Sequence, residues 1–306
     1  MNDDRASTAL IRLRAALGRA RPFGAVLGLL LLIAAVVVVL RSGPALDAAW
    51  SALRDAPIMS VLALLGSVFA GVFLTGCVFW ILTRRFGQVS FGDMQALMAA
   101  TTLANYLPLR PGLLARVAYH HAHHSIRARD SLRTIVEAML LSVIALATLV
   151  PSLMLAHWLA LPLTAALVAP AALGAAALPF RRVRMLALAW ELRYLETLLT
   201  ALRYHIAFAL IGAPVPFATS CAIACVSMIA TLVPFVSNGI GLREWSIGLL
   251  APVLAGYELE QGLAAELLHR AAEIAVIVPT GLLGFAWLWR RSITAQPAPS
   301  GDQAHS

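Results

Sequence analysis

Apolar runs dominate this sequence and limit what the chain can fold into. The chain has 306 residues, of which 60% are hydrophobic and only 12% are charged. Several runs approach the ~20 apolar residues that a helix needs to cross the hydrocarbon core of a bilayer. Because the bilayer core offers no water to backbone groups, apolar segments of this length cross it as helices. The sequence therefore predicts an all-α polytopic membrane protein.

The arrangement of the runs predicts about eight transmembrane crossings. Seven uninterrupted runs are read as spanning helices, and one of two interrupted or re-entrant segments supplies the eighth crossing. The seven runs cover residues 24–40, 58–82, 134–156, 161–180, 190–211, 217–236 and 263–289. No loop between them is long enough for a separate globular domain. We therefore expect a basic cytoplasmic tail (1–22), a single transmembrane helical domain (23–291) and a disordered cytoplasmic tail (292–306).

The positive charges indicate the orientation of the chain. All 23 basic residues are arginine, and the formal net charge is +8. With the N-terminus inside, seventeen arginines fall in cytoplasmic segments and two, Arg41 and Arg54, fall outside. This asymmetry predicts that both termini are cytoplasmic. The arginines flank apolar spans and form no aromatic-interleaved patch, which favours contact with anionic lipid headgroups and argues against nucleic-acid binding.

One interruption lies within residues 91–116, where the stretch LANYLPLRPGLLAR (103–116) follows an apolar run. Its two prolines each remove a backbone donor and displace the preceding residue from helical geometry. A broken backbone at membrane depth is tolerated where protein or a water-filled cavity satisfies it. We expect a re-entrant or hinged segment with Arg110 at the break, because the planar fork of arginine suits phosphate. An ordinary cytoplasmic loop with two prolines is the other interpretation.

A second interruption occupies residues 237–256 and begins with SNGIGLRE (237–244). Gly239 and Gly241 permit backbone conformations that other residues resist. A helix that starts near Leu242 would direct its N-terminal amides at a bound anion. Two interruptions, one in each half of the chain, favour a paired transport site. A plain tight turn between two spans is the other interpretation of this segment.

Charged residues also lie inside the predicted fifth span, at spacings of three and four that place them on one helical face. The charged residues are Arg193, Glu196 and Arg203, and the polar Thr200 lies on the same face. Arg193 would pair with Glu196, whereas Arg203 lacks an acid on its own helix and would serve a ligand or Glu137. Charges within a span usually face the bundle interior or a water cavity. A helix that lies at the interface and never spans would carry the same stripe.

The last span carries Arg270 and Glu273, three apart on one face, which form either a structural or a functional ion pair.

Four histidines at 120–124 suggest a metal site, but no carboxylate or cysteine nearby completes a ligand shell. We expect a solvated, pH-sensitive basic loop there. The three cysteines lie inside apolar runs and are interpreted as packing residues. No cofactor is expected, because no nucleotide- or metal-binding motif is present.

Two short motifs resemble those of the membrane-embedded, flippase-like domain of bacterial lysylphosphatidylglycerol synthases and its stand-alone integral membrane relatives. Asn-x-Leu-Pro-x-Arg, followed by a downstream arginine, is matched by Asn105, Leu107, Pro108, Arg110 and Arg116. Gly-Ile-Gly-x-Arg-Glu is matched by Gly239, Ile240, Gly241, Arg243 and Glu244. A glutamate and an arginine of later spans resemble Glu137 and Arg270. The pattern departs at Ala138, where an arginine often stands, and at Ser237 and Asn238, where Pro-Gly is usual.

The resemblance implies a lipid flippase or lipid-transport protein of the bacterial inner membrane. In that family the aminoacyl transfer resides in a separate soluble domain, so no aminoacyl-transferase activity is expected of this chain. Related stand-alone members are linked to isoprenoid-type lipids, so the expected cargo is an anionic or isoprenoid-type lipid. Membrane lipids are the expected partners, together with a homo-oligomer or a lipid-biosynthesis partner.

The expected site joins both interruptions in a polar groove near the bilayer midplane. The residues expected to bind substrate are Asn105, Arg110, Arg116, Asn238, Gly239, Gly241 and Arg243. The residues expected to balance charge or carry protons are Glu137, Glu196, Arg203, Glu244, Arg270 and Glu273. Because a buried arginine without an acid partner is costly, these groups should pair with one another. The alternative function is a membrane glycosyl- or acyltransferase acting on a lipid-linked substrate, and a non-catalytic scaffold is a third class.

Overall fold

The computed structural model describes residues 30, 33–34, 36–37, 40, 44–107, 110–181, 183–232 and 237–294. These residues form helices and turns, and no strand occurs among them. In chain order the elements are α2 (Pro44–Arg54), α3 (Ile58–Thr83), α4 (Phe91–Ala104), α5 (Pro111–His124), α6 (Ala128–Trp158), α7 (Leu163–Ala177), α8 (Arg184–Leu210), α9 (Phe217–Leu232), the short 3-10 helix η1 (Ser237–Gly239), α10 (Leu242–Ala255) and α11 (Leu259–Thr294). The predicted all-α fold is confirmed for this part of the chain.

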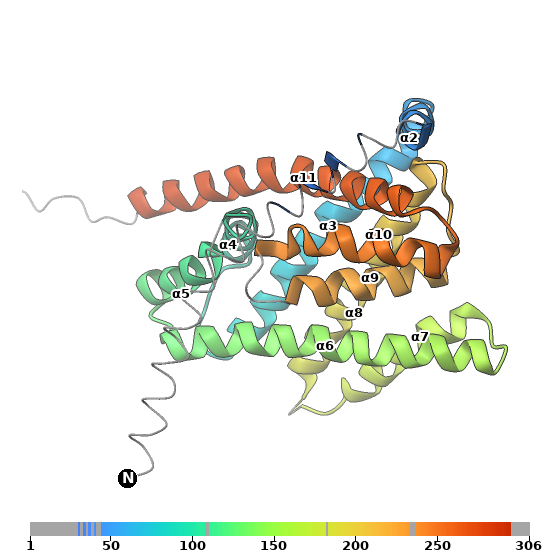
Figure 1. Ribbon diagram of the computed structural model, residues 1–306. Coiled ribbons are helices and arrows are strands. Elements are labelled where there is room, and N and C mark those ends of the chain that lie inside the picture. Colours follow the sequence, from blue (N-terminus) through green and yellow to red (C-terminus); the bar gives the residue numbers. More distant parts are fainter. Residues whose placement is uncertain are drawn as a thin grey trace, which may run out of the picture.

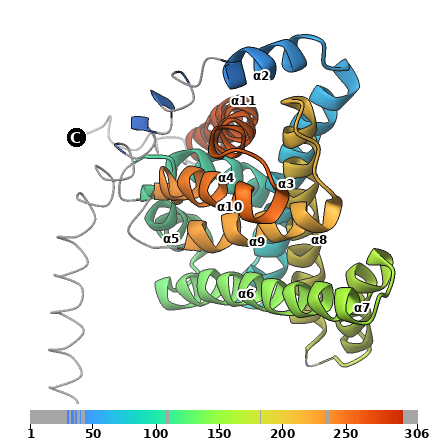
Figure 2. The same ribbon diagram turned by 45° about the vertical axis from the view of Figure 1, so that its right-hand side comes forward.

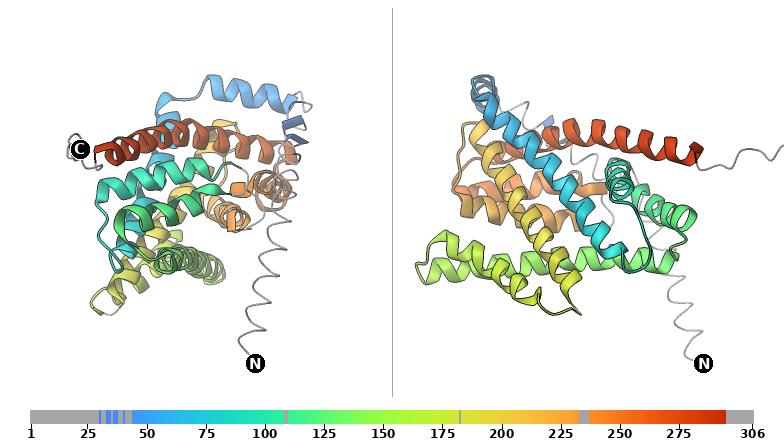
Figure 3. Two further views of the ribbon diagram at one scale, coloured as in Figure 1. Left: turned by 90° about the vertical axis from the view of Figure 1, so that its left-hand side faces the viewer. Right: turned by 180° about the vertical axis from the view of Figure 1, so that it is seen from behind.

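The helices form a bundle in which α11 and α6 lie on opposite sides, with α9 and α10 between them (Figures 1 and 2). α11 packs along α4 and α10, and α5 packs against α4 and α6. α3 and α8 run side by side across the bundle, as the view from behind shows (Figure 3, right). Since both also contact α6 and α11, they join the two sides.

Three of the described helices are long and apolar enough to cross a membrane: α3, α6 and the Leu259–Arg291 part of α11. α7 and α9 are apolar but shorter. Large apolar side chains on the three long helices face outward, among them Phe69, Leu140 and Leu283. Apolar surface of this kind is typical of a membrane contact.

Parts of the predicted membrane topology fall outside the described residues. The tail 1–22 and residues 295–306 lie there, as does most of the predicted first span, 24–40. α11 continues to Thr294, so residues 292–294 are helical and do not belong to the predicted tail. The predicted eight crossings and the orientation stay predictions.

The first predicted interruption is present between α4 and α5. α4 ends at Ala104, and α5 begins with Pro111, whose missing N–H costs nothing at the first position of a helix. Arg110, which precedes it, has a left-handed backbone with φ of 48°. Pro108, the other proline of this break, lies outside the described residues. Gly112 allows α5 to fold back closely, because a Cβ there would meet the backbone oxygen of Thr101.

The second predicted interruption lies between α9 and α10. Three residues of the turn that follows α9 have a positive φ: Asn238 (47°), Gly239 (69°) and Gly241 (81°). The glycines adopt this geometry without steric cost, and asparagine tolerates it better than most residues. α10 then begins at Leu242, where the sequence predicted a helix start.

The contact between α4 and α11 is close because small residues line it. A Cβ on Gly284 would lie 2.5 Å from the backbone oxygen of Ala96. At the start of α4, the Ser90 hydroxyl accepts a hydrogen bond from the backbone N–H of Asp93 (3.1 Å) and caps the helix. The carboxylate of Asp93 in turn accepts from Trp287 Nε1 (3.0 Å) and pairs with Arg291 (2.7 Å) near the end of α11. These contacts hold α4, and so the first break, at a fixed position along α11.

The predicted loop at the four histidines of residues 120–124 is wrong, because these residues are helical. α5 continues to His124, and α6 already begins at Ala128. His120 is fully buried, because this face of α5 packs on α6, where the Ser131 hydroxyl lies 2.9 Å from His120 Nδ1. No group of three or more histidine, cysteine or acidic side chains in the described residues is placed to hold a metal ion.

Candidate functional site

The two interruptions meet in the structure. The Arg110 side chain at the first break donates from Nη2 to the backbone oxygen of Thr231 (3.0 Å), in the last turn of α9 before the second break. Tyr106, also in the first break, donates its hydroxyl to Glu273 Oε2 of α11 (3.1 Å). The first break therefore contacts both the approach to the second break and the middle of α11.

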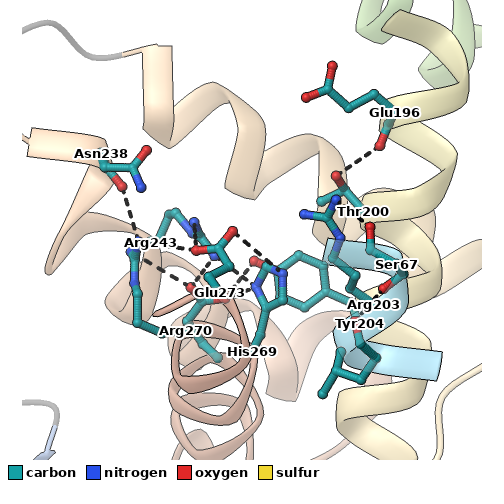
Figure 4. A network of polar contacts seen from close by, with 12 residues as sticks. Ser67, Glu196, Thr200, Arg203, Tyr204, Asn238, Arg243, His269, Arg270 and Glu273 are labelled. Atoms are coloured by element: carbon teal, nitrogen blue, oxygen red, sulfur yellow. Dashed lines mark hydrogen bonds and ion pairs between the residues drawn. The ribbon is translucent and has the colours of Figure 1, made fainter. Parts of the chain in front are cut away.

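Beside the second break lies a buried network of charges between α10 and α11 (Figure 4). Arg243 pairs with Glu266 Oε1 (2.7 Å) and Glu273 Oε2 (3.0 Å). Arg270 pairs with Glu244 Oε1 (2.9 Å) and more distantly with Glu273 Oε2 (3.5 Å). All five residues are buried. The predicted Arg270–Glu273 pair is present, but as one contact of a larger network.

Two neutral side chains complete this network. Tyr204 of α8, fully buried, donates its hydroxyl to Glu266 Oε2 (2.5 Å). His269 Nδ1 lies 2.8 Å from Arg243 Nη2. Because a guanidinium can only donate, Nδ1 must accept, which assigns the neutral tautomer with its proton on Nε2. That nitrogen lies 3.8 Å from Glu273 Oε1.

The local sequence explains why these charges converge. Arg243 and Glu244 fall in the first turn of α10, directly after the positive φ of Gly241. On α11, Glu266, Arg270 and Glu273 are four and three residues apart and so share one helical face. Sequence reasoning missed Glu266, together with its partners His269 and Tyr204. The spacing of Glu266 relative to Arg270 was the signal that could have found it.

A second charged group lies between α8 and α3. Arg193 Nη1 pairs with Glu196 Oε2 (2.5 Å), as the sequence predicted. Glu196 also accepts a hydrogen bond from the Thr75 hydroxyl of α3 (2.7 Å). This places the Glu196 carboxylate against α3 within the bundle. α8 is not among the described helices that are long and apolar enough to cross a membrane, so the choice between a spanning and an interfacial helix stays open.

Arg116 of α5 is buried beside this second group. Its guanidinium lies over the ring of Phe79 (4.0 Å to the centroid) and donates from Nη2 to the Thr101 hydroxyl (3.3 Å). Arg193 approaches the same ring at 5.7 Å. A ring face and a hydroxyl stabilise a buried arginine less than a carboxylate would, so Arg116 adds uncompensated positive charge to this region.

Arg203, on the polar face of α8, is the other buried arginine without a carboxylate partner among the described residues. It is 7% exposed and donates from Nη2 to the backbone oxygen of Ser67 in α3 (3.0 Å). The predicted contact with Glu137 is wrong. Glu137 instead pairs with Arg85 and with Arg133 (3.0 Å) near the start of α6, because α6 carries it away from the middle of α8.

These elements line a partly open polar cavity of about 170 Å³. Its polar lining residues come from both interruptions and from four helices: Thr75, Thr102, Tyr106, Glu196, Arg203, Asn238 and Glu273. Val68, Gly71, Val72 and Ile277 complete the lining. The α3 residues of the lining lie in the middle of that helix, as Glu273 and Ile277 do in α11. A polar cavity therefore lies midway along two helices that are long enough to cross a bilayer.

The predicted site residues do not all lie at the cavity. Glu196, Arg203, Asn238 and Glu273 line the cavity. Arg243, Glu244 and Arg270 form the network behind Glu273, while Gly239 and Gly241 shape the turn that carries Asn238. Asn105, Arg110 and Arg116 belong to the first break and its neighbourhood without lining the cavity, and Glu137 lies apart. Whether each of them binds substrate stays a prediction.

Comparison with known proteins adds no assignment to this geometry. No family model, no curated protein and no solved structure matches the chain. The resemblance to the membrane domain of the lysylphosphatidylglycerol synthases therefore stays a prediction that rests on the two short motifs.

Proposed function

We propose that this protein is a lipid flippase or lipid-transport protein of the bacterial inner membrane that handles an anionic or isoprenoid-type lipid and lacks aminoacyl-transferase activity. The observation that carries the proposal is the polar cavity midway along α3 and α11, where both helix interruptions meet. Polar groups at such a position are expensive in a bilayer and are typical of a transport pathway.

The charges around the cavity support an anionic headgroup. Five buried arginines line it or belong to the charged groups beside it: Arg116, Arg193, Arg203, Arg243 and Arg270. Four glutamates lie among them: Glu196, Glu244, Glu266 and Glu273. With His269 neutral, these residues carry one more positive charge than negative ones. Because burying uncompensated charge is costly, an anion such as a lipid phosphate would stabilise this arrangement.

The pairing of the cavity carboxylates favours transport over a transferase. A transferase acting on a lipid-linked substrate needs a positioned group that is free to exchange a proton with the reacting atoms. Glu273 is held by Arg243 and Tyr106, and Glu196 by Arg193 and Thr75. Both carboxylates are thus occupied by donors that stabilise their charge. Formation of a product from a lipid-linked sugar would favour the transferase.

The orientation and partners follow from the sequence. The excess of arginine in segments assigned to the inside supports cytoplasmic termini. Membrane lipids are the proposed ligands, and a second copy of the chain or a lipid-biosynthesis protein is the proposed protein partner.

The test is headgroup translocation of labelled lipids in proteoliposomes, with anionic, zwitterionic and isoprenoid cargos compared. Arg203→Met removes the charge at the cavity, and Arg110→Ala removes the side chain at the first break. Arg129→Met is the matched control, because Arg129 is exposed near the start of α6. We expect translocation of an anionic cargo to fall for both test variants and to persist for the control. Absence of translocation for every cargo, with folded and correctly oriented protein, would overturn the proposal.

A further inference from the structure

An apolar groove lies on the surface formed by α3, α4 and α11. It has a volume of about 360 Å³. Small residues of α4 and α11 form its floor, namely Gly92, Ala96, Ala99 and Gly284. Its walls carry Phe69, Phe73, Leu283 and Trp287, whose side chains are substantially exposed. The groove is therefore hollow because its floor lacks large side chains, and its apolar walls are exposed on the surface of the bundle.

The groove lies next to the polar cavity. Val72 of α3 lines both of them. On α4 the groove reaches Ala99 and the cavity begins at Thr102, three residues on. On α11 the cavity reaches Ile277 and the groove begins at Thr280, again three residues away. Since each helical residue advances about 1.5 Å, less than one turn separates groove and cavity on both helices.

We propose that the groove and the cavity together bind one amphiphile, a long hydrocarbon chain that ends in a phosphate, with the chain in the groove and the phosphate at Arg203. This inference rests on the proposed function and adds the placement of the ligand. The buried Arg203 guanidinium bonds to a carbonyl and pairs with no carboxylate of the described residues, so it supplies the charge for the head end. The groove supplies apolar surface for the chain.

The sizes of the two spaces limit the ligand further. The cavity of about 170 Å³ is smaller than the ~300–1,000 Å³ typical of sites for drug-sized ligands. It suits a phosphate or another small anionic head, while a large sugar head would have to extend beyond it. A phospholipid and an isoprenoid phosphate share this head chemistry, so the experiment has to separate them.

Photo-crosslinking in detergent solution tests the placement. The probe is a long-chain alkyl monophosphate that carries a diazirine in its chain, compared with the corresponding alcohol. Crosslinked peptides identified by mass spectrometry should come from the groove segments 69–73, 92–99 and 280–287. We expect Arg203→Met to reduce labelling by the phosphate about tenfold, the factor that corresponds to about 1.4 kcal/mol, and to leave labelling by the alcohol unchanged.

Filling the groove tests whether the hydrocarbon chain of the ligand binds there. Gly92→Leu places a large side chain in the groove without a backbone clash, since a Cβ at Gly92 meets only Trp287 at 3.7 Å. Gly66→Leu on α3 is the matched control, because nothing lies within 4 Å of a Cβ there. Labelling should fall for Gly92→Leu and persist for Gly66→Leu. Equal labelling by the phosphate and the alcohol in every variant would show ordinary surrounding lipid and would overturn the inference.

Competition separates the two sources of the phosphate. Unlabelled phosphatidic acid or polyprenyl phosphate should displace the probe, and the stronger competitor identifies the lipid class. Displacement by neither would overturn the inference. Specific labelling in a protein that translocates no lipid would support this binding site and contradict the transport proposal. Translocation that is unaffected by Gly92→Leu, in a protein whose groove shows no specific labelling, would support the transport proposal and contradict this binding site.

Discussion

The Arg203 guanidinium packs against Gly71 of α3. It occupies the space that a side chain at position 71 would need. A Cβ built on Gly71 would overlap Arg203 Nη2. The same nitrogen donates to the backbone oxygen of Ser67, one turn earlier on α3 (3.0 Å). Gly71 and Ser67 together therefore place the charge of Arg203 at the polar cavity, which both Gly71 and Arg203 line.

We predict that Gly71→Ala reduces lipid transport without unfolding the protein. The added methyl group displaces the far end of a flexible side chain, so the helix can stay in place while the charge moves. We expect transport of an anionic cargo to fall about tenfold, equivalent to about 1.4 kcal/mol, with the midpoint of thermal unfolding nearly unchanged. Gly66→Ala is the control on the same helix, since its Cβ meets nothing within 4 Å. Equal transport by both variants would contradict this role for Arg203.

Breaking the buried network should destabilise the whole bundle. Glu266→Ala removes one carboxylate from Arg243 and the acceptor from Tyr204, and both partners stay buried. Loss of one partner of a buried ion pair typically costs about 3–5 kcal/mol. The free energy of unfolding, measured by sodium dodecyl sulfate titration in mixed micelles, should fall by about 3–5 kcal/mol. Glu258→Gln, at an exposed position just before α11, should have little effect.

Local signals made both interruptions predictable from the sequence. Proline and glycine act through their own backbone, so Pro111 and Gly241 indicate a break wherever they stand in the bundle. Pairs three residues apart on one helix were equally accessible, and Arg193 with Glu196 is the example. These features need no knowledge of which helices are neighbours.

Contacts between helices were not predictable in this way. Arg203 was expected to serve a ligand or Glu137. Of these, the Glu137 contact is absent, and the acceptor is a backbone oxygen of α3, because α3 lies beside the polar face of α8. The burial of His120 likewise depends on how α5 packs on α6. One sequence shows the spacing of polar residues along each helix, but the rotation and neighbours of the helix decide what those residues touch.

Backbone and side-chain roles of Arg110 can be separated experimentally. Its φ of 48° suits glycine and strains alanine, by about 1–2 kcal/mol. Arg110→Gly and Arg110→Ala both lose the contact with Thr231. We expect both variants to lose transport, and the alanine variant to be the less stable of the two in thermal unfolding. Normal transport by Arg110→Gly would show that only the backbone of this residue matters.

The close return of α5 onto α4 gives a further prediction, on stability and transport together. Gly112→Ala would press a methyl group against the backbone oxygen of Thr101 and to within 2.6 Å of Asn105 Oδ1. A backbone atom inside a helix cannot move aside as a side chain can, so the break itself must open. Overpacking of this kind costs about 1–3 kcal/mol. Opening the break would also move Tyr106 away from Glu273, so we expect transport to fall with stability.

Gly92→Ala serves as the control for Gly112→Ala, because both glycines lie in the first turns of their helices and a Cβ at Gly92 makes only an ordinary contact with Trp287 at 3.7 Å. The unfolding free energy in mixed micelles should be unchanged or slightly raised for Gly92→Ala, since alanine favours the helix by about 1 kcal/mol over glycine. Gly112→Ala should lower it. If the two variants are equally stable, the close contact between α5 and the Thr101 carbonyl does not hold the first break in place, and the position of Tyr106 at the cavity must depend on its bond to Glu273.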